Sequence, residues 1–86
     1  MATYVPVLPL DTIEDESDVV QLEEGQVHNL VFSGTGTVGV YAVTDTSSSF
    51  IGDFSTENPG GRLLGPISYK AIRHEIGKKS AIGYYA

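Results

Sequence analysis

From residue 18 onward, short apolar runs alternate with polar turns that contain glycine. Within most runs apolar and polar side chains alternate, which is the two-residue period of a strand with one face against a core. Short runs of this kind, bounded by turn residues, predict strands rather than helices. The predicted strands cover residues 19–22, 27–32, 37–44, 50–54, 68–76 and 80–85, and residues 62–67 are extended at best.

The spacing of these strands predicts how they pair. The first three are joined by the glycine turns 23–26 and 33–36, so we expect an antiparallel meander. The third is apolar on both faces, so it should be central. The last two should form a hairpin with a basic turn; a helix is the alternative for 68–76. The sequence therefore predicts an all-β fold, a small antiparallel β-sandwich or open barrel of about six or seven short strands with an extended N-terminal arm.

The N-terminal segment 4–10 is apolar but contains Pro6 and Pro9. Each proline removes a backbone donor and favours extended geometry before it, which excludes a helix or a central strand. An apolar arm left in water would expose surface that usually marks a contact site. We expect the arm to dock on another chain; docking on its own domain and disorder are the alternatives.

Residues 11–18 hold five acids in eight positions, and dense like charge resists compaction. We therefore expect a solvated linker here, with one helical turn as the alternative. The predicted domain organisation is an extended arm and acidic linker over residues 1–17, followed by a single β domain over residues 18–86.

Charge is divided unevenly along the chain. Residues 1–61 contain no Lys or Arg and carry a net charge of −10, whereas residues 62–86 carry +4. The acidic majority would be repelled by phosphates, which argues against nucleic-acid binding. We expect the two halves to fit each other, within one chain or between copies; two solvated faces that never meet are the alternative. No apolar run reaches the ~20 residues of a bilayer span, so no membrane contact is predicted.

The chain has no cysteine, and a core this thin usually requires a disulfide, a metal or a partner chain. The sequence also lacks the ligand spacing of a metal site, because His28 and His74 are far apart in the chain. Each is expected to be a solvent-facing or hydrogen-bonded histidine rather than a catalytic base. Gly34, Gly36 and Gly39 match G-x-G-x-x-G, but a valine-rich strand follows instead of a helix, so we interpret them as a hairpin turn. No catalytic residue, cofactor or metal is predicted.

Two other functions remain open. A carbohydrate-binding module would use Tyr69, Tyr84 and Tyr85 as a sugar platform, although packing at an edge is the ordinary role for such residues. A small hydrolase would need His28 or His74 to approach a serine and an acid.

The stretch DVVQLEEGQVHNLVFSGTGTVGVYAVTD, residues 18–45, resembles segments of small bacteriophage virion proteins, in particular capsid decoration (cement) proteins and head-fibre bases. This resemblance implies a non-enzymatic protein of the capsid surface, assembled in the host cytoplasm, that binds the major capsid protein or other virion subunits, often as a trimer. A receptor-binding β module of a fibre or tail is the alternative. The predicted partner-binding residues are Tyr4, Val5, Pro6, Val7, Leu8, Pro9, Leu10, Arg62, Lys70 and Arg73.

Overall fold

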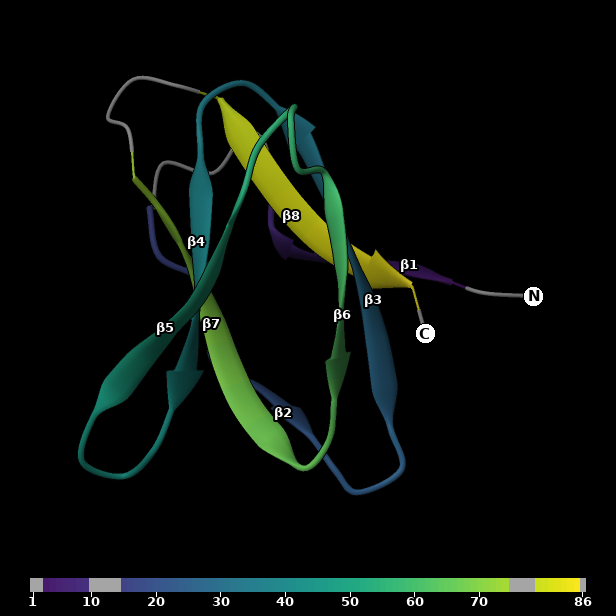
Figure 1. Ribbon diagram of the computed structural model, residues 1–86, viewed down its shortest axis with the longest axis vertical. Helices are drawn as coiled ribbons and strands as arrows, with labels where there is room; N and C mark the ends of the chain where they lie inside the picture. The colour runs from purple at the N-terminus through teal and green to yellow at the C-terminus, as the bar shows by residue number, and fades with distance from the viewer. Residues whose placement is uncertain (1–2, 10–14, 75–78, 86) are drawn as a thin grey trace.

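The computed structural model describes residues 3–9, 15–74 and 79–85. These residues form eight β-strands and no helix, so none of them belongs to a helix that could span a bilayer (Figure 1). The strands are β1 (Tyr4–Leu8), β2 (Val20–Leu22), β3 (Val27–Gly34), β4 (Val38–Val43), β5 (Ser48–Phe54), β6 (Gly60–Leu64), β7 (Ile67–Arg73) and β8 (Ser80–Tyr85). The predicted all-β fold is confirmed.

The strands form two four-stranded antiparallel sheets. Sheet A has the order β1-β8-β3-β6 and sheet B the order β2-β7-β4-β5. The first strand is the neighbour of the last, the second of the seventh, the third of the sixth and the fourth of the fifth. The chain thus resembles one long two-stranded ribbon rolled over itself, which is the jelly-roll form of a β-sandwich. Figure 1 shows β4, β5 and β7 on one side and β3 and β6 on the other.

The pairing predicted from the sequence is wrong in two places. The strands β2, β3 and β4 alternate between the sheets instead of forming a meander, and β7 and β8 lie in different sheets instead of forming a hairpin. Among the described strands, only β4 and β5 are joined as a hairpin, through a turn in which Thr44 N–H donates to Ser47 O at 2.8 Å. Alternation tells which side chains face the core, but it does not identify the neighbouring strand.

The glycine turns serve as arches between the sheets. Gly34 and Gly36 have φ values of 97° and 80°, which only glycine adopts readily, and they carry the chain from β3 in sheet A to β4 in sheet B. The predicted hairpin turn at this G-x-G-x-x-G match is therefore wrong, although a strand does follow it. Residues 62–67 were predicted as extended at best, and residues 62–64 belong to the full strand β6, which begins at Gly60.

The core lies between the sheets, and in β3 and β7 its residues alternate with less buried ones. In β3 the buried positions are His28, Leu30 and Phe32, and in β7 they are Tyr69, Ala71 and Arg73. Each large apolar side chain buried there contributes about 1.5–3 kcal/mol. The hydrophobic core consists of Leu8, Leu22, Leu30, Phe32, Val38, Val40, Phe54, Tyr69, Ala71 and Ile82.

The N-terminal segment belongs to the sandwich. Residues 4–8 form β1, which pairs with β8 along the edge of sheet A, with Tyr4 opposite Tyr85. Of the alternatives for the arm, docking on its own domain is therefore the one observed for these residues.

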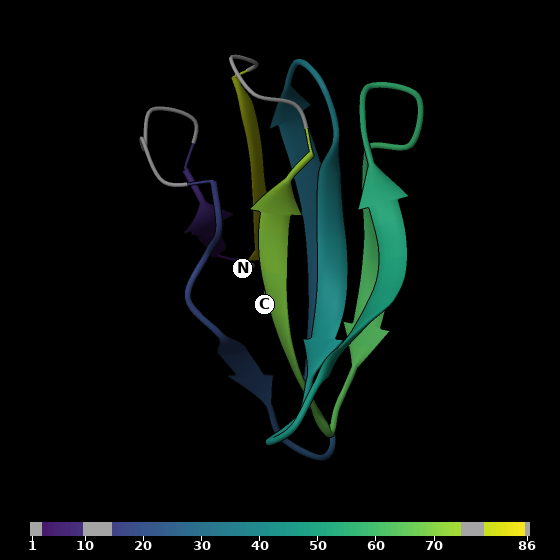
Figure 2. The ribbon, with the colours of Figure 1, turned by 90° about the vertical axis from the view of Figure 1, so that its left-hand side faces the viewer.

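Part of the predicted acidic linker is also ordered against the sheet. Ser17 N–H donates to Ala71 O at 2.8 Å and Arg73 N–H donates to Asp15 O at 2.7 Å, so residues 15–18 run beside β7 and lead into β2 (Figure 2). Residues 15–17 are therefore held against the sheet instead of forming a free linker, because β7 supplies backbone partners for them. Residues 10–14 lie outside the described part of the chain.

Candidate binding faces

The predicted arm residues are divided between surface and core. Tyr4 and Val5 are 40% and 36% exposed, whereas Leu8 is 1% exposed and packs in the core. Leu8 is thus committed to its own domain, and the start of β1 is the part available to a partner. Of the others, Pro6 and Pro9 are exposed, Val7 is half-buried and Leu10 lies outside the described residues.

The three predicted basic residues do not share one surface. Arg62 is exposed on the outward side of sheet A, and Lys70 lies on the outward side of sheet B. Arg73 points between the sheets, where its side chain is 3% exposed. The structure therefore provides no single basic patch from these residues, and each has a different role.

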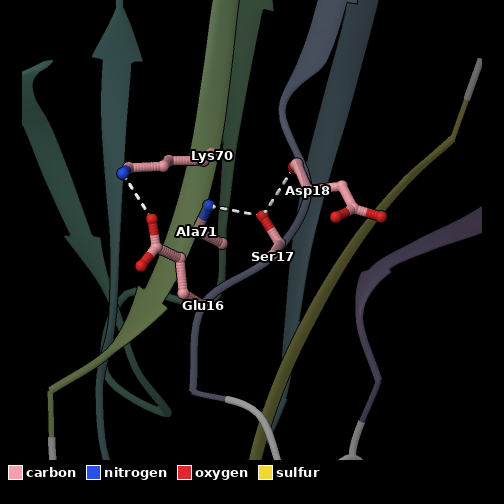
Figure 3. Close-up of polar contacts among 5 residues, drawn as sticks. All are labelled: Glu16, Ser17, Asp18, Lys70 and Ala71. Atoms are coloured by element: carbon pink, nitrogen blue, oxygen red, sulfur yellow. Dashed lines mark hydrogen bonds and ion pairs between the residues drawn. The ribbon is translucent and has the colours of Figure 1, made fainter.

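Lys70 joins the acidic and basic parts of the chain. Its ammonium group forms an ion pair with Glu16, while Ser17 Oγ accepts a hydrogen bond from Ala71 N–H at 2.8 Å (Figure 3). A partly exposed ion pair of this kind contributes up to about 1 kcal/mol. The predicted fit between the two oppositely charged parts is confirmed here, within one chain.

Arg73 has a structural role and contacts three other segments of the chain. Its Nε–H donates to Ser80 O at 2.8 Å, another of its N–H groups donates to Pro9 O, and its guanidinium lies 3.7 Å from the Asp15 carboxylate. A buried guanidinium is stable only when it is paired and hydrogen-bonded. Arg73 thus ties β7 to the residue after β1, to the start of β8 and to the segment before β2, and it is not a surface contact.

The outward side of sheet A, here called the sheet A face, carries a continuous row of side chains. In the strand register Tyr4 lies opposite Tyr85, Tyr85 opposite Asn29, and Asn29 opposite Arg62. The row therefore crosses all four strands. The two tyrosine rings are in contact, with centroids 5.2 Å apart and an angle of 57° between their planes.

The neighbouring row of the sheet A face has no side chain at two of its four positions. It consists of Pro6, Gly83, Val31 and Gly60. The ring of Tyr4 lies over Gly83, where a Cβ would come within 2.4 Å of the tyrosine oxygen. Partial burial, and secondarily Tyr85, raises the pKa of Tyr4 above its ordinary value.

Apolar side chains complete the sheet A face near β6. Leu64 is 63% exposed and Val27, its cross-strand partner, is 36% exposed. Tyrosine and arginine are enriched in the cores of protein interfaces, where charged residues such as lysine and glutamate are depleted. The sheet A face has this composition, because Tyr4, Tyr85 and Arg62 stand among exposed aliphatic side chains.

Three of the four edge strands carry features that disfavour strand addition. In sheet A, the edge strand β1 contains Pro6, which has no N–H to donate. In sheet B, the edge strand β5 carries a bulge where Ile51 is the extra residue, and the other edge strand, β2, has three residues. These are common devices against edge-to-edge pairing. Strand pairing through these three edges is therefore disfavoured.

The first histidine is buried between the sheets. His28 is 7% exposed, and its Nδ1 is hydrogen-bonded to the Tyr69 hydroxyl at 2.9 Å. Its ring is stacked on Tyr84, with centroids 3.5 Å apart and planes within 8°. Burial lowers the pKa of His28, and it raises the pKa of Tyr69, with Tyr84 adding to the latter effect. This is the hydrogen-bonded histidine that the sequence allowed.

The second histidine lies on the outward side of sheet B. His74 Nδ1 is 3.1 Å from Asp53 Oδ1, and His74 Nε2 is 2.8 Å from the Tyr41 hydroxyl. Phe50, 55% exposed, completes this group, with its ring centroid 5.5 Å from that of Tyr41. We call Tyr41, Phe50, Asp53 and His74 the sheet B cluster.

A glycine makes the sheet B cluster possible. Gly39 pairs with Ile72 on one side and Asp53 on the other, and a Cβ there would come within 2.3 Å of His74 Nε2. Glycine in the interior of a strand costs about 0.5–1 kcal/mol and often marks a close approach. Here the absence of a side chain lets the His74 ring lie on the sheet between its two partners.

The structure also bears on the two other functional hypotheses, the carbohydrate-binding module and the small hydrolase. Tyr69 is fully buried and Tyr84 faces the core, so the predicted sugar platform with Tyr85 does not form. In the described residues, the rings of His28 and His74 are hydrogen-bonded to tyrosines and, for His74, to Asp53, not to a serine. The sequence reasoning missed Tyr41, Phe50 and Asp53.

Comparisons with protein-family models, with curated proteins and with solved structures find no match for this chain.

Proposed function

We propose that the protein is a non-enzymatic structural component of a virus particle, which decorates or cements the capsid by binding the major capsid protein through the sheet A face. The observation that carries the proposal is the row from Tyr4 to Arg62 with its exposed aliphatic neighbours. An exposed surface of this composition is suited to another protein surface. On this proposal the protein works at the capsid surface, after assembly in the host cytoplasm.

The fold is compatible with this role, as an analogy. Jelly rolls occur in viral capsid proteins and also in lectins and cupins, so the fold alone does not select a function. The features that disfavour strand addition at β1, β2 and β5 add to the argument, because a protein that sits in many copies on a lattice must not polymerise through its strands. We further propose that it is a homo-oligomer, with a trimer favoured; sedimentation equilibrium measures this directly.

Co-sedimentation with assembled particles tests the docking face. Because β1 is part of the sandwich, deleting residues 1–10 would remove Leu8 from the core, and point variants are preferable. Tyr85→Asp and Arg62→Glu should each lower particle occupancy at least about tenfold, the loss of roughly 1.4 kcal/mol or more that is common at interface centres. Val19→Ala and Gln21→Glu, exposed positions next to and in β2 of sheet B, are the matched controls.

The proposal fails if all four variants and the parent protein bind particles equally, or if the parent protein does not bind them. Circular dichroism of each variant separates loss of docking from loss of folding.

A further inference from the structure

The sheet B cluster lies on the opposite side of the sandwich from the sheet A face, because it points outward from the other sheet. We propose that this cluster is a binding site for neutral pyranose sugars. The inference goes beyond the proposed docking function and does not depend on it. A particle bound to the sheet A face would leave the cluster in solvent.

The aromatic part of the site is Phe50. Its side chain is 55% exposed on an outward position of β5, and the Tyr41 ring supports it from the side at 5.5 Å with an angle of 65° between the planes. A supported aromatic ring with a free face is the surface on which the apolar C–H face of a pyranose packs. The His74 ring, inclined by 30° to Phe50 with centroids 6.3 Å apart, extends this surface.

The polar part of the site is the chain Asp53–His74–Tyr41. When His74 is neutral, its Nδ1–H donates to Asp53 and the Tyr41 hydroxyl donates to Nε2, which leaves the second carboxylate oxygen of Asp53 free to accept. When His74 is protonated, both ring nitrogens donate, and the Tyr41 O–H becomes free to donate outward. The cluster can therefore present acceptors alone or acceptors with a donor.

The hydrogen-bond donors and acceptors that the cluster offers favour some ligand classes over others. Sugar hydroxyls both donate and accept, so they fit the cluster in either protonation state of His74. A guanidinium or ammonium group only donates, and it would lie beside a second positive charge when His74 is protonated. Anionic sugars are disfavoured by the Asp53 carboxylate, and Lys70, the cation opposite Tyr41 on the same side of sheet B, is paired with Glu16.

The test is direct binding to the free protein. A glycan microarray identifies candidate sugars, and NMR titration with the methyl glycosides of glucose, galactose and mannose measures them. We expect saturable shifts at the four cluster residues, with a Kd of about 1 mM, which is typical of a shallow site with few contacts. Phe50→Ala and Asp53→Asn should each weaken binding at least about tenfold, while Val19→Ala and Glu24→Gln keep it.

Three results would overturn the proposal. One is a blank array together with no saturable shift for any glycoside. Another is sugar binding that survives Phe50→Ala and Asp53→Asn. The third is a response of the cluster to N-acetylarginine methylamide but not to sugars, which would assign the site to an arginine of a protein partner. Dispersed amide spectra of each variant establish that it is folded.

Discussion

The molecule contains two tyrosine–histidine pairs with nearly the same hydrogen-bond length and opposite surroundings. His28 and Tyr69, 2.9 Å apart, are enclosed between the sheets, whereas His74 and Tyr41, 2.8 Å apart, lie on the outside of sheet B. The inner pair has a stacked tyrosine ring beside it, and the outer pair has a carboxylate. The comparison teaches that the same bond serves stability where water is excluded, and remains available to a ligand where it is not.

Removing each histidine should separate the two roles most clearly. His28→Ala leaves a cavity beside Tyr84 and an unpaired hydroxyl on Tyr69, so we expect the free energy of unfolding to fall by about 3 kcal/mol. His74→Ala, at the surface, should cost less than about 1 kcal/mol. Urea unfolding followed by circular dichroism measures both. Equal losses for the two variants would contradict the comparison.

Removing only the tyrosine hydroxyls gives a smaller and cleaner contrast. Tyr69→Phe keeps the ring but leaves the buried Nδ1 of His28 without its partner, at a cost of about 1–3 kcal/mol. Tyr41→Phe should cost about 0.5 kcal/mol, since water can replace the lost bond. The measurement is the urea midpoint of each variant, compared where the free energy of unfolding depends on urea concentration with the same slope. A larger loss for Tyr41→Phe would reverse the assignment of roles.

The buried pair should also make stability depend on pH. The pKa of His28 is lowered from its ordinary value of 6.5 by burial, so the unfolded chain takes up the proton first as the pH falls. The stabilisation is therefore complete above about pH 6.5 and is lost as the pH falls towards the pKa of the folded state.

One such group changes the free energy of unfolding by at most about 1.4 kcal/mol per pH unit. The free energy of unfolding, measured between about pH 7.5 and 5.5, should fall below about pH 6.5 in the parent protein and in His74→Ala, and should fall less steeply in His28→Ala. A slope that is unaffected by His28→Ala would rule out this origin.

The smallest expected effect is at the glycine beneath the outer pair. Gly39→Ala places a methyl group against the far end of the His74 ring, which can swing into solvent, so stability should change by less than about 0.5 kcal/mol. The ring, however, must leave Tyr41. Histidine NMR signals should shift in Gly39→Ala and not in Gly52→Ala, where a Cβ meets nothing within 4 Å. Unchanged His74 signals in Gly39→Ala would show that the glycine is not needed.

The sequence predicted the strands better than their neighbours. Residues 38–43 were located because a valine-rich run follows a glycine turn, and residues 80–85 because a short apolar run follows the turn at 77–80, and both signals are local. Pairing depends on contacts between distant parts of the chain, so nothing local in residues 27–34 indicates that their neighbours are residues 60–64 and 80–85.

The candidate sites were harder to predict for the same reason. Tyr41, Phe50 and Asp53 look like ordinary outward positions until β4, β5 and β7 are placed side by side, with His74 at the end of β7. Arg73 was predicted as a partner contact from its charge alone. Its burial follows from the phase of β7, which places Arg73 on the inward side of the strand; a shift of one residue would place it on the outward side. The charge division, by contrast, did anticipate the ion pairs of Lys70 and Arg73 with acids before β2.

The rolled-ribbon order also determines when the protein can fold during its synthesis. The last strand, β8, is an inner strand of sheet A and lies between β1 and β3. Until residues 80–85 have left the ribosome, β1 has no strand to pair with and the inner side of sheet B lacks part of its cover. The nascent chain should therefore stay open until residues 80–85 are available, and a product truncated before them should be an easy target for proteases.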